Sequence, residues 1–233
     1  MAVKRKPPNG NVRRVEAHGD SERSTIVSKG DRTIQCESFG ERRWALLLDR
    51  NLRVRDYGSQ PEEFEFFDGL GRRHTYTPDF IVWFVDGHVE IHEVTRSYRR
   101  TREEIKRREE AAARICDGRK GWSYVVHTEE DLPDGPDLAN LLVLIGWRAR
   151  AYAEPGVEGA CLARLSDGRA HPLRALVDNI AREVDIPRSD VVAALGHLLW
   201  HGHIEADLTR SLFVNAEDAA ATDMHNPAPA SSS

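Results

Sequence analysis

The chain of 233 residues is poor in cysteine and lacks any long hydrophobic run. Its three cysteines (Cys36, Cys116 and Cys161) are odd in number and widely spaced, which argues against both a zinc-type pairing and a disulfide framework. No apolar segment approaches the roughly 20 residues that a membrane-spanning helix needs, and residues 1–11 are basic and polar, unlike an export signal. We therefore expect a soluble protein of the reducing cytoplasm.

An excess of positive charge is also lacking, because the net charge is -5 at pH 7. Taken alone, this deficit argues against binding to a polyanion such as DNA. The positive charge is nevertheless concentrated in a leader and in a second run further along the chain. The leader comprises Lys4, Arg5, Lys6, Arg13 and Arg14, and the second run comprises Arg96, Arg99, Arg100, Arg102, Lys106, Arg107 and Arg108. A solvated helix face paired with glutamates is one interpretation of the second run, but its place directly after an acidic motif favours contact with DNA.

The composition divides the chain into four segments. Residues 1–30 are rich in charge, glycine, proline and serine, which predicts a mobile basic arm. Residues 31–132 form a first domain, residues 138–216 a second, and residues 217–233 a disordered tail. The boundary lies in the linker 131–137, because two prolines and a glycine among acids prevent regular structure.

The first domain is predicted as an α/β fold, a mixed sheet flanked by helices, with ordered structure beginning near Thr33. A capping box, Ser38-x-x-Glu41, predicts a helix that ends near residues 49–51. Runs of β-branched and aromatic residues predict strands, and residues 101–116 have helical propensity. The predicted strands span residues 54–57, 64–67, 74–77, 80–85, 89–94 and 122–127. Because a helix separates the last two strands, we expect a crossover and a parallel pair.

The second domain is predicted to be mostly helical. Helices are expected over residues 138–152, 172–184 and 188–201, with a further stretch at 157–165 and two short strands at 204–208 and 211–214. Helix, turn, helix and β-hairpin is the order of a winged helix. The expected recognition helix offers few basic side chains, so a protein-docking role is favoured over base readout.

Three acids stand where a metal-dependent phosphodiesterase needs them: Glu41 on a helix, Asp79 before a strand, and Glu93 near the end of the paired strand. Mg²⁺ and Mn²⁺ bind carboxylate oxygens and activate a bound water, and the carbonyl oxygen of Val94 is a candidate further ligand. Structural alternatives exist, since Glu41 could cap its helix and Asp79 could end a turn. Glu93, inside an apolar strand, requires a cation or hydrogen bonds in any case. His92 alternates away from Glu93 and is expected on the other face.

The two strand acids share a face only if the hairpin loop between their strands has an odd number of residues. A two-residue turn would place Glu93 on the opposite side of the sheet from Asp79. We predict instead a three-residue loop, residues 86–88, which pairs Ile81 with Glu93 and Asp79 with Thr95.

Thr77-Pro78-Asp79-Phe80, followed by Glu93-Val94-Thr95, resembles the signature of PD-(D/E)xK nucleases. More narrowly, a set of short segments in a fixed order resembles the TnsA family, the endonuclease subunit of heteromeric transposases. These segments are residues 37–41, 54–57, 76–80 and 91–94. The resemblance covers roughly residues 33–130 and implies a restriction-endonuclease-like fold, and the C-terminal segment is similar to the winged-helix domain of TnsA proteins.

The resemblance implies a role for individual residues. Glu41, Asp79 and Glu93 match the family's acidic metal-ligand positions. Thr95 departs from the pattern, which has a lysine there, so either Arg96, Arg99 or Lys106 supplies the cation from a neighbouring position, or catalysis is impaired. The residues expected to contact DNA are Arg96, Arg99, Arg100 and Arg102.

The resemblance also implies a Mg²⁺- or Mn²⁺-dependent endonuclease that cuts the 5′ ends of a transposon. An integrase-like partner transposase would cut and join the 3′ ends, and an ATPase regulator would dock on the C-terminal domain. Two alternatives stay open: a nuclease-impaired subunit that binds DNA and partners, and a free-standing restriction or repair nuclease of the same superfamily. A transcriptional regulator ranks last, because the winged helix has a poor basic face.

Overall fold

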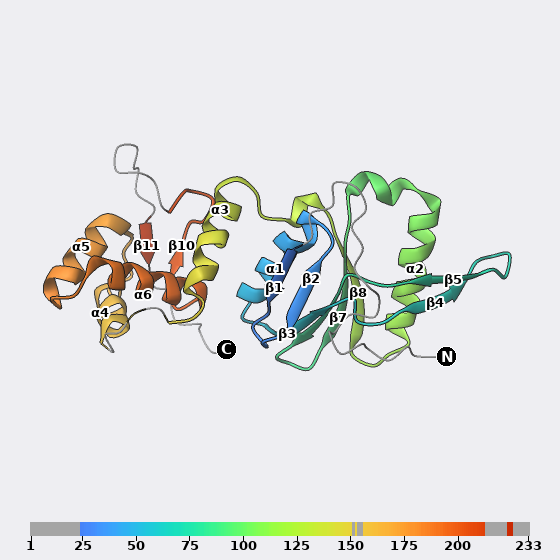
Figure 1. Cartoon of the computed structure of the whole chain (residues 1–233), viewed down its shortest axis with the longest axis horizontal. Helices are drawn as coiled ribbons and strands as arrows, with labels where there is room; N and C mark the ends of the chain where they lie inside the picture. Colours follow the sequence, from blue (N-terminus) through green and yellow to red (C-terminus); the bar gives the residue numbers. More distant parts are fainter. Residues whose placement is uncertain (1–23, 151, 153–155, 213–222, 226–233) are drawn as a thin grey trace. The chain divides into compact units, whose positions relative to one another are not determined.

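The structure, a computed structural model, describes residues 24–150, 152, 156–212 and 223–225 (Figure 1). The chain divides into two units, Met1–Pro133 and Asp134–Ser233, and the division falls inside the predicted linker. The basic leader, and the predicted tail apart from residues 223–225, lie outside the described residues. Each unit is described by itself below.

Unit 1 contains a four-stranded sheet, two β-hairpins and two long helices among its described residues. In chain order its elements are β1 (Ser24–Val27), β2 (Thr33–Cys36), α1 (Phe39–Arg50), β3 (Val54–Ser59), β4 (Phe64–Phe67), β5 (Arg73–Tyr76), β6 (Phe80–Phe84), β7 (Val89–Val94), the 3₁₀ helix η1 (Ser97–Thr101), α2 (Glu103–Asp117), β8 (Trp122–His127) and the 3₁₀ helix η2 (Glu129–Asp131).

The main sheet has the order β3-β6-β7-β8. The first two pairings are antiparallel, and β7 and β8 are parallel because α2 carries the chain across between them. This mixed sheet with flanking helices confirms the predicted fold class and is consistent with a restriction-endonuclease-like fold.

Alternation along β6 and β7 gives the two faces of the sheet separate cores. Phe80 and Val82 pack against Leu48 of α1, whereas Ile81 and Ile91 pack in the core that includes Ala112 of α2. The two helices therefore cover opposite faces, and a residue of β7 meets α1 or α2 according to whether its number is even or odd.

Order in unit 1 begins earlier than predicted. β1 pairs antiparallel with β2, from Ser24 opposite Cys36 to Val27 opposite Thr33, although these residues of β1 fall in the segment assigned to a mobile arm. The strand buries only alternate positions, and those only in part, so its apolar pattern is weak in the sequence. Its stability comes from pairing with the buried residues of β2 rather than from its own composition.

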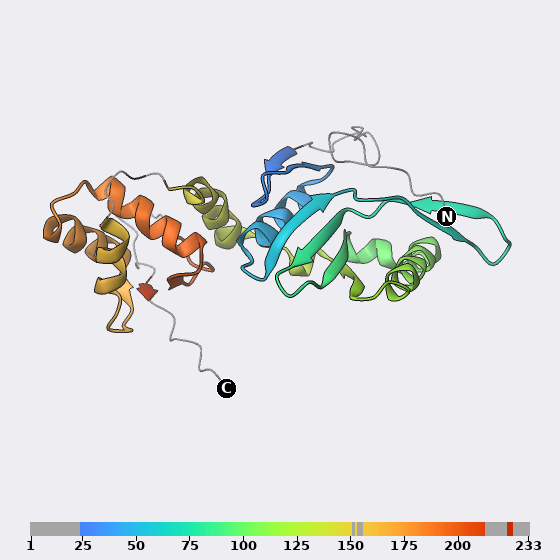
Figure 2. The same ribbon diagram turned by 90° about the horizontal axis from the view of Figure 1, so that it is seen from below.

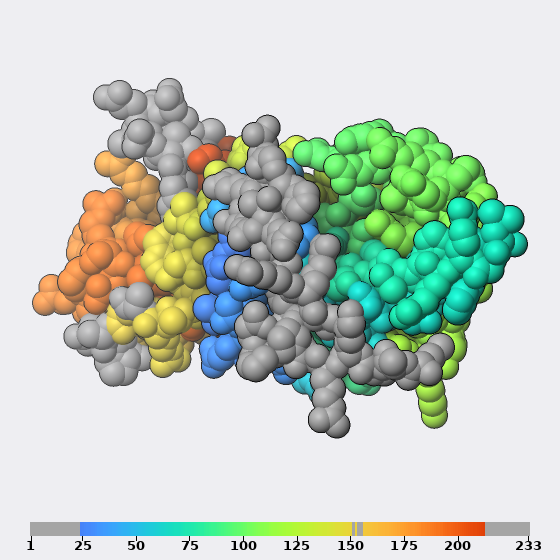
Figure 3. Space-filling view, turned by 45° about the vertical axis from the view of Figure 1, so that its right-hand side comes forward, coloured from blue at the N-terminus to red at the C-terminus, as the bar shows by residue number. Residues whose placement is uncertain are grey.

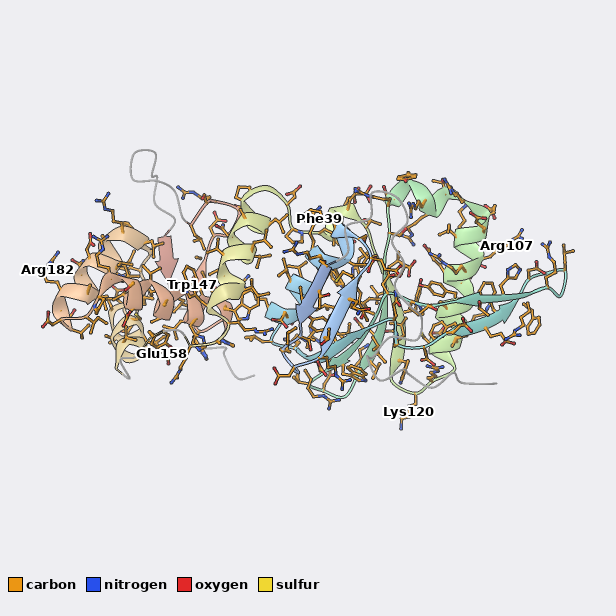
Figure 4. All side chains as sticks on the ribbon, viewed as in Figure 1. Phe39, Arg107, Lys120, Trp147, Glu158 and Arg182 are labelled. Atoms are coloured by element: carbon orange, nitrogen blue, oxygen red, sulfur yellow. The ribbon has the colours of Figure 1, made fainter. Side chains whose placement is uncertain are left out.

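The β4–β5 hairpin extends beyond the main sheet (Figure 2) and lies alongside α2 on the surface (Figure 3). Phe67 at the end of β4 and Leu70 in the hairpin loop are exposed to solvent. A hollow of about 780 Å³ between the hairpin and α2 is lined by residues of both, including Phe66 of β4 and Arg107 of α2; Figure 4 labels Arg107.

Unit 2 consists mainly of helices. Its described elements are α3 (Gly135–Leu144), the 3₁₀ helix η3 (Ile145–Trp147), α4 (Val157–Arg164), β9 (His171–Pro172), α5 (Leu173–Glu183), α6 (Arg188–Trp200), β10 (Glu205–Ala206) and β11 (Asp223–His225). α3 starts within the predicted linker, because Pro136 in a first helical turn costs no hydrogen bond. It ends at Leu144, well before the predicted residue 152.

The small sheet of unit 2 contains residues that the sequence assigned to a disordered tail. β10 pairs with β11, which lies within the predicted tail 217–233, and β11 also pairs with β9, so the order is β10-β11-β9. The strand predicted at residues 211–214 lies partly outside the described residues. The pairing joins residues far apart in sequence, which local turn signals do not reveal. The winged helix stays a prediction.

α6 is the central helix of unit 2, and most of its side chains are buried, including those of Leu195 and Trp200. The indole ring of Trp147 (Figure 4) packs directly on Gly196, leaving no space for a β-carbon. His197 and His201, predicted to decorate this helix, bond to the carbonyl oxygens of Trp147 and Arg148. Little of α6 is left to read DNA bases.

Candidate metal centre

The hairpin register decides whether the two strand acids meet. Phe84 bonds to His88 across a three-residue loop, residues 85–87, and Ile81 pairs with Ile91. The predicted odd loop length is correct, but the loop lies one residue earlier than predicted, and Ile81 pairs with residue 91 rather than with the predicted residue 93. Extending the observed register by one step from Phe80 and His92 places Asp79 directly opposite Glu93. Both acids therefore lie on the α2 face.

Asp79 is fixed at the start of β6 by its neighbours on both sides. Its carboxylate accepts a hydrogen bond of 2.8 Å from the backbone N–H of Val94, and its carbonyl oxygen accepts one of 2.8 Å from Gln60. Burial, followed by repulsion from Glu93 and Glu41, raises the pKa of Asp79 well above its usual range. Without a cation, this carboxyl favours the protonated form.

Glu93 is 6% exposed and is held by three partners. The hydroxyl of Tyr76 donates to one carboxylate oxygen, and Arg108 Nη2 donates to the other at 2.5 Å. Burial raises the pKa of Glu93, while Arg108, Tyr76 and a hydrogen bond with the Asp79 carboxyl oppose that rise. A hydrogen bond between two carboxyl groups requires that one of them is protonated.

Glu41 contributes from the first turn of α1, next to its N-cap residue Ser38. Its two carboxylate oxygens accept from the backbone N–H of Glu37 at 2.8 Å and from the Ser38 hydroxyl at 2.9 Å. The helix-capping alternative is therefore part of the structure. Burial, with a contribution from Glu93, raises the pKa of Glu41 to about 7, although the hydrogen bonds from Glu37 and Ser38 oppose the rise. Glu41 is thus electrostatically coupled to the strand acids while bonded to its own loop.

These residues suit a hard divalent cation by donor chemistry. Asp79 and Glu93 offer carboxylate oxygens on one face, and burial is the largest cause of the raised pKa of each. Within the described residues, no group of three His, Cys, Asp or Glu side chains is already arranged to hold a metal ion. Glu41 would have to release one of its loop hydrogen bonds to become a third ligand.

The cation beside the acids is not one of those predicted. Lys106 donates to Glu103 of its own helix at 3.1 Å, half exposed, and Thr95 donates its backbone N–H to His127. Arg108 contacts Glu93 instead. Residues two positions apart on a helix, such as Lys106 and Arg108, point in directions that differ by about 200°, and only Arg108 faces the sheet. The sequence held a signal for this, since Arg108 lies on the same helical stripe as the predicted apolar positions 105, 112 and 115.

Two of the four predicted DNA-binding arginines share a pocket whose lining includes Val94 and Thr95, the two residues after Glu93, but none of the three acids. Arg96 and Arg99 line a pocket of about 340 Å³ at the start of α1, together with Thr95 and the exposed Phe39 (Figure 4). Arg43, also in this pocket, donates to the carbonyl oxygens at residues 132 and 133. The backbone N–H groups of a helix start and two exposed arginines favour an anion.

The other two arginines lie further along the chain. Arg100 forms an ion pair with Glu109 of α2 at 3.1 Å, and Arg102 is exposed at the start of that helix. Arg100 is therefore partly neutralised within the protein, which weakens its case as a contact to DNA.

His92 lies on the α1 face, away from Glu93, as predicted. Its Nδ1 accepts from Trp44 at 3.0 Å, and its Nε2 bonds to Glu90 at 2.7 Å. His127 stacks on Trp44, and burial lowers the pKa of His127 to about 4. This aromatic cluster braces α1 against the end of the sheet that carries the acids.

Residues 51–129 match the family model described as TnsA-like endonuclease N terminal. Unit 1 carries a TnsA-like endonuclease domain. The match confirms the resemblance drawn from the motifs, and it includes Asp79, Glu93 and Arg108 but begins after Glu41. No curated protein matches the chain significantly. Among the described residues, no helix is long and apolar enough to cross a membrane.

Proposed function

We propose that the chain is a divalent-metal-dependent DNA endonuclease that acts as one subunit of a heteromeric transposase. The TnsA-like domain supports a nuclease of the transposase-subunit type. The observation that carries the metal dependence is the register that puts Asp79 opposite Glu93, with the pKa of each raised by burial and that of Asp79 raised further by the charge of Glu93. Mg²⁺ or Mn²⁺ is the cofactor that such an oxygen-only site prefers.

The chain's own residues divide the work of phosphodiester hydrolysis. Asp79, Glu93 and the Val94 carbonyl would hold the metal, with Glu41 as a further ligand once it leaves its loop. When bound, the metal supplies charge to a phosphate oxygen and lowers the pKa of a water. Hydrolysis would join a water oxygen to phosphorus and break the bond to the leaving sugar oxygen; the attacking water would release a proton to solvent, and the leaving oxygen would take one up.

The pocket beside α1 is a candidate subsite for the DNA backbone. Arg96 and Arg99 would bind phosphates there, beside Val94 and Thr95 rather than along the outer surface of α2. Phosphate contacts position a duplex without reading its sequence, so this subsite gives register and not specificity. Arg102 would extend the contact, and Arg100 would do so only after release from Glu109.

Partners account for the rest of the proposal. The 5′-end cuts would be made alongside a partner transposase that processes the 3′ ends, and unit 2 would dock an ATPase regulator. The burial of α6 supports protein docking over base readout, because a recognition helix needs a free polar face.

A second candidate is a nuclease-impaired assembly subunit. Two observations favour it: Thr95 supplies no positive charge, and both oxygens of Glu41 are engaged by their own loop. Thr95→Lys separates the two candidates. If the second candidate holds, restoring a lysine raises cleavage by at least about 100-fold, whereas an active enzyme gains less than about tenfold.

Cleavage of transposon-end DNA tests the proposal directly. The chain, reconstituted with a partner transposase, is assayed with Mg²⁺ or Mn²⁺ and with EDTA. Asp79→Ala and Glu93→Ala should each reduce cleavage by at least about 100-fold, and Glu104→Gln, an exposed acid on α2, should leave it unchanged. Metal-independent cleavage, or full activity in the alanine variants, would refute the proposal.

A further inference from the structure

Arg108 is the one arginine or lysine, within the described part of the chain, that hydrogen-bonds to any of the three acids. It reaches the site from the second turn of α2, fifteen residues along the chain from Glu93. Its contact therefore depends on the crossover that returns α2 to the sheet, not on a local motif.

The guanidinium of Arg108 is fixed on one side and open on the other. Its Cζ atom lies 4.6 Å from the ring centre of Tyr76, and Tyr76 itself donates to Glu93. A guanidinium has five N–H groups, yet Glu93 is the only carboxylate that Arg108 pairs with among the described residues. About a quarter of the side chain, 26%, remains exposed. The guanidinium thus keeps N–H donors that no carboxylate of the described residues engages.

A second observation concerns the remaining nitrogen. Arg108 Nε is buried and has no hydrogen-bond acceptor in the described residues. Buried donors are almost always satisfied, so an arginine used only as a counter-ion would be expected to place this N–H on a carbonyl or carboxylate. The geometry is that of a cation oriented by Tyr76 and Glu93 with part of its binding capacity unused.

We propose that Arg108 binds a non-bridging oxygen of the scissile phosphate and is the catalytic cation of this site. The inference rests on the proposed nuclease function and names the residue that takes over the charge which Thr95 does not supply. Arg108 neutralises charge that develops on the phosphate as the new bond forms. It transfers no proton, because a guanidinium stays protonated at all working pH values.

Binding of metal alone distinguishes this role from a scaffolding role. Tb³⁺ luminescence, sensitised by Tyr76 and Tyr124 beside the acids, reports occupancy without DNA or turnover. Arg108→Gln removes a positive charge next to Glu93, so Tb³⁺ should bind within about threefold of the wild-type affinity or more tightly. If Arg108 only holds Glu93 in position, the Tb³⁺ affinity of Arg108→Gln should fall by more than about threefold, and this result would overturn the proposal.

Cleavage at saturating DNA and Mn²⁺ is the second arm. Arg108→Gln should lower kcat by about 100-fold with KM for DNA little changed, because the contact strengthens as charge develops. Arg108→Lys keeps the charge and should recover at least about tenfold of that loss. Arg107→Gln, on the outer side of the same helix, is the matched control and should leave kcat unchanged.

The outcomes separate the two levels of inference. If Asp79→Ala abolishes cleavage but Arg108→Gln lowers kcat by less than about tenfold, Arg108 is not the catalytic cation and the nuclease function stands. If Asp79→Ala has no effect, the nuclease function itself fails. Should Arg108→Gln not fold, Arg108→Lys carries the test: a kcat loss of between about threefold and thirtyfold with unchanged Tb³⁺ affinity supports the role, and any other result overturns it.

Discussion

Replacing Asp79 by asparagine separates what this carboxylate costs the fold from what it contributes to chemistry. Asparagine keeps an oxygen that can accept the backbone N–H of Val94, so the local hydrogen bond survives. It removes a buried negative charge that lies opposite Glu93. The variant should therefore be more stable than the wild type in metal-free buffer while losing cleavage.

The size of the gain follows from the charges around Asp79. Two unit charges 4 Å apart repel by about 4 kcal/mol at an effective dielectric constant of 20. Arg108 cancels part of this repulsion, and protonation of one of the two carboxyl groups relieves more of it. We expect Asp79→Asn to raise the free energy of unfolding by about 1–2 kcal/mol, which corresponds to roughly 3–8 °C in Tm for a unit of this size.

The raised pKa of Asp79 determines how the stability of the wild type changes with pH. Because this pKa is raised in the folded state, the contribution of Asp79 to folding stability is complete below its unfolded pKa near 4 and is lost as pH rises through the raised pKa. Below about pH 4 the wild type and Asp79→Asn should therefore melt together, and the difference should grow as pH rises. Mg²⁺ should then raise the Tm of the wild type but not of the variant.

Thermal melts in EDTA between pH 4 and 8, with and without Mg²⁺, measure these effects. Asp68→Asn is the matched control, because the backbone N–H of Arg72 and other hydrogen bonds lower the pKa of Asp68. Its neutralisation should leave Tm unchanged or reduce it. A lower Tm for Asp79→Asn in EDTA, or a stabilisation by Mg²⁺ equal to that of the wild type, would refute the reasoning.

Three further predictions follow from other parts of the structure. The pKa of His127 is lowered to about 4, so its contribution to folding stability is lost as pH falls from about 6.5 to 4. In His127→Phe, Tm should therefore depend less on pH across that range, and an unchanged slope of Tm against pH would contradict this. Gly196→Ala should destabilise the protein by about 1–3 kcal/mol in urea titrations, because its β-carbon would overlap a tryptophan ring. Gly159→Ala, where a β-carbon meets no atom within 4 Å, should stabilise it by a few tenths to about 1 kcal/mol. Equal effects of the two substitutions would contradict the packing argument. Arg96→Ala with Arg99→Ala should weaken DNA binding in Ca²⁺ equally for all sequences and reduce the slope of log K against log salt by about 2, and a sequence-dependent loss would count against a phosphate subsite.

Strand and helix positions in unit 1 were predictable because local chemistry decides them. β4, β7 and β8 have the expected bounds, and α1 begins after Ser38, whose hydroxyl accepts from Glu41 as a capping residue should. In each case an apolar or β-branched run, or a cap, lies within the element itself.

The shared face of the two strand acids was predictable from the sequence, but their exact pairing was not. Parity alone put Asp79 and Glu93 on one face, but the exact pairing depends on a turn in which Gly87 adopts a positive φ of 88° and Val85 joins the loop. The role of Arg108 depends on how α2 docks, which is a tertiary property. The predicted Lys106 failed for the same reason, since proximity in sequence does not give direction around a helix.

The hydrogen bonds from Arg43 to the last residues of unit 1 have a mechanical consequence. Arg43 lies two residues beyond Glu41 on α1 and donates to the carbonyl oxygens of Leu132 and Pro133, where the chain leaves the unit. Tension on that exit strand is delivered first to the helix holding Glu41, and only afterwards to the sheet that holds Asp79 and Glu93. A partner pulling at the far side of the linker would thus act on the acid whose oxygens are still tied to their own loop.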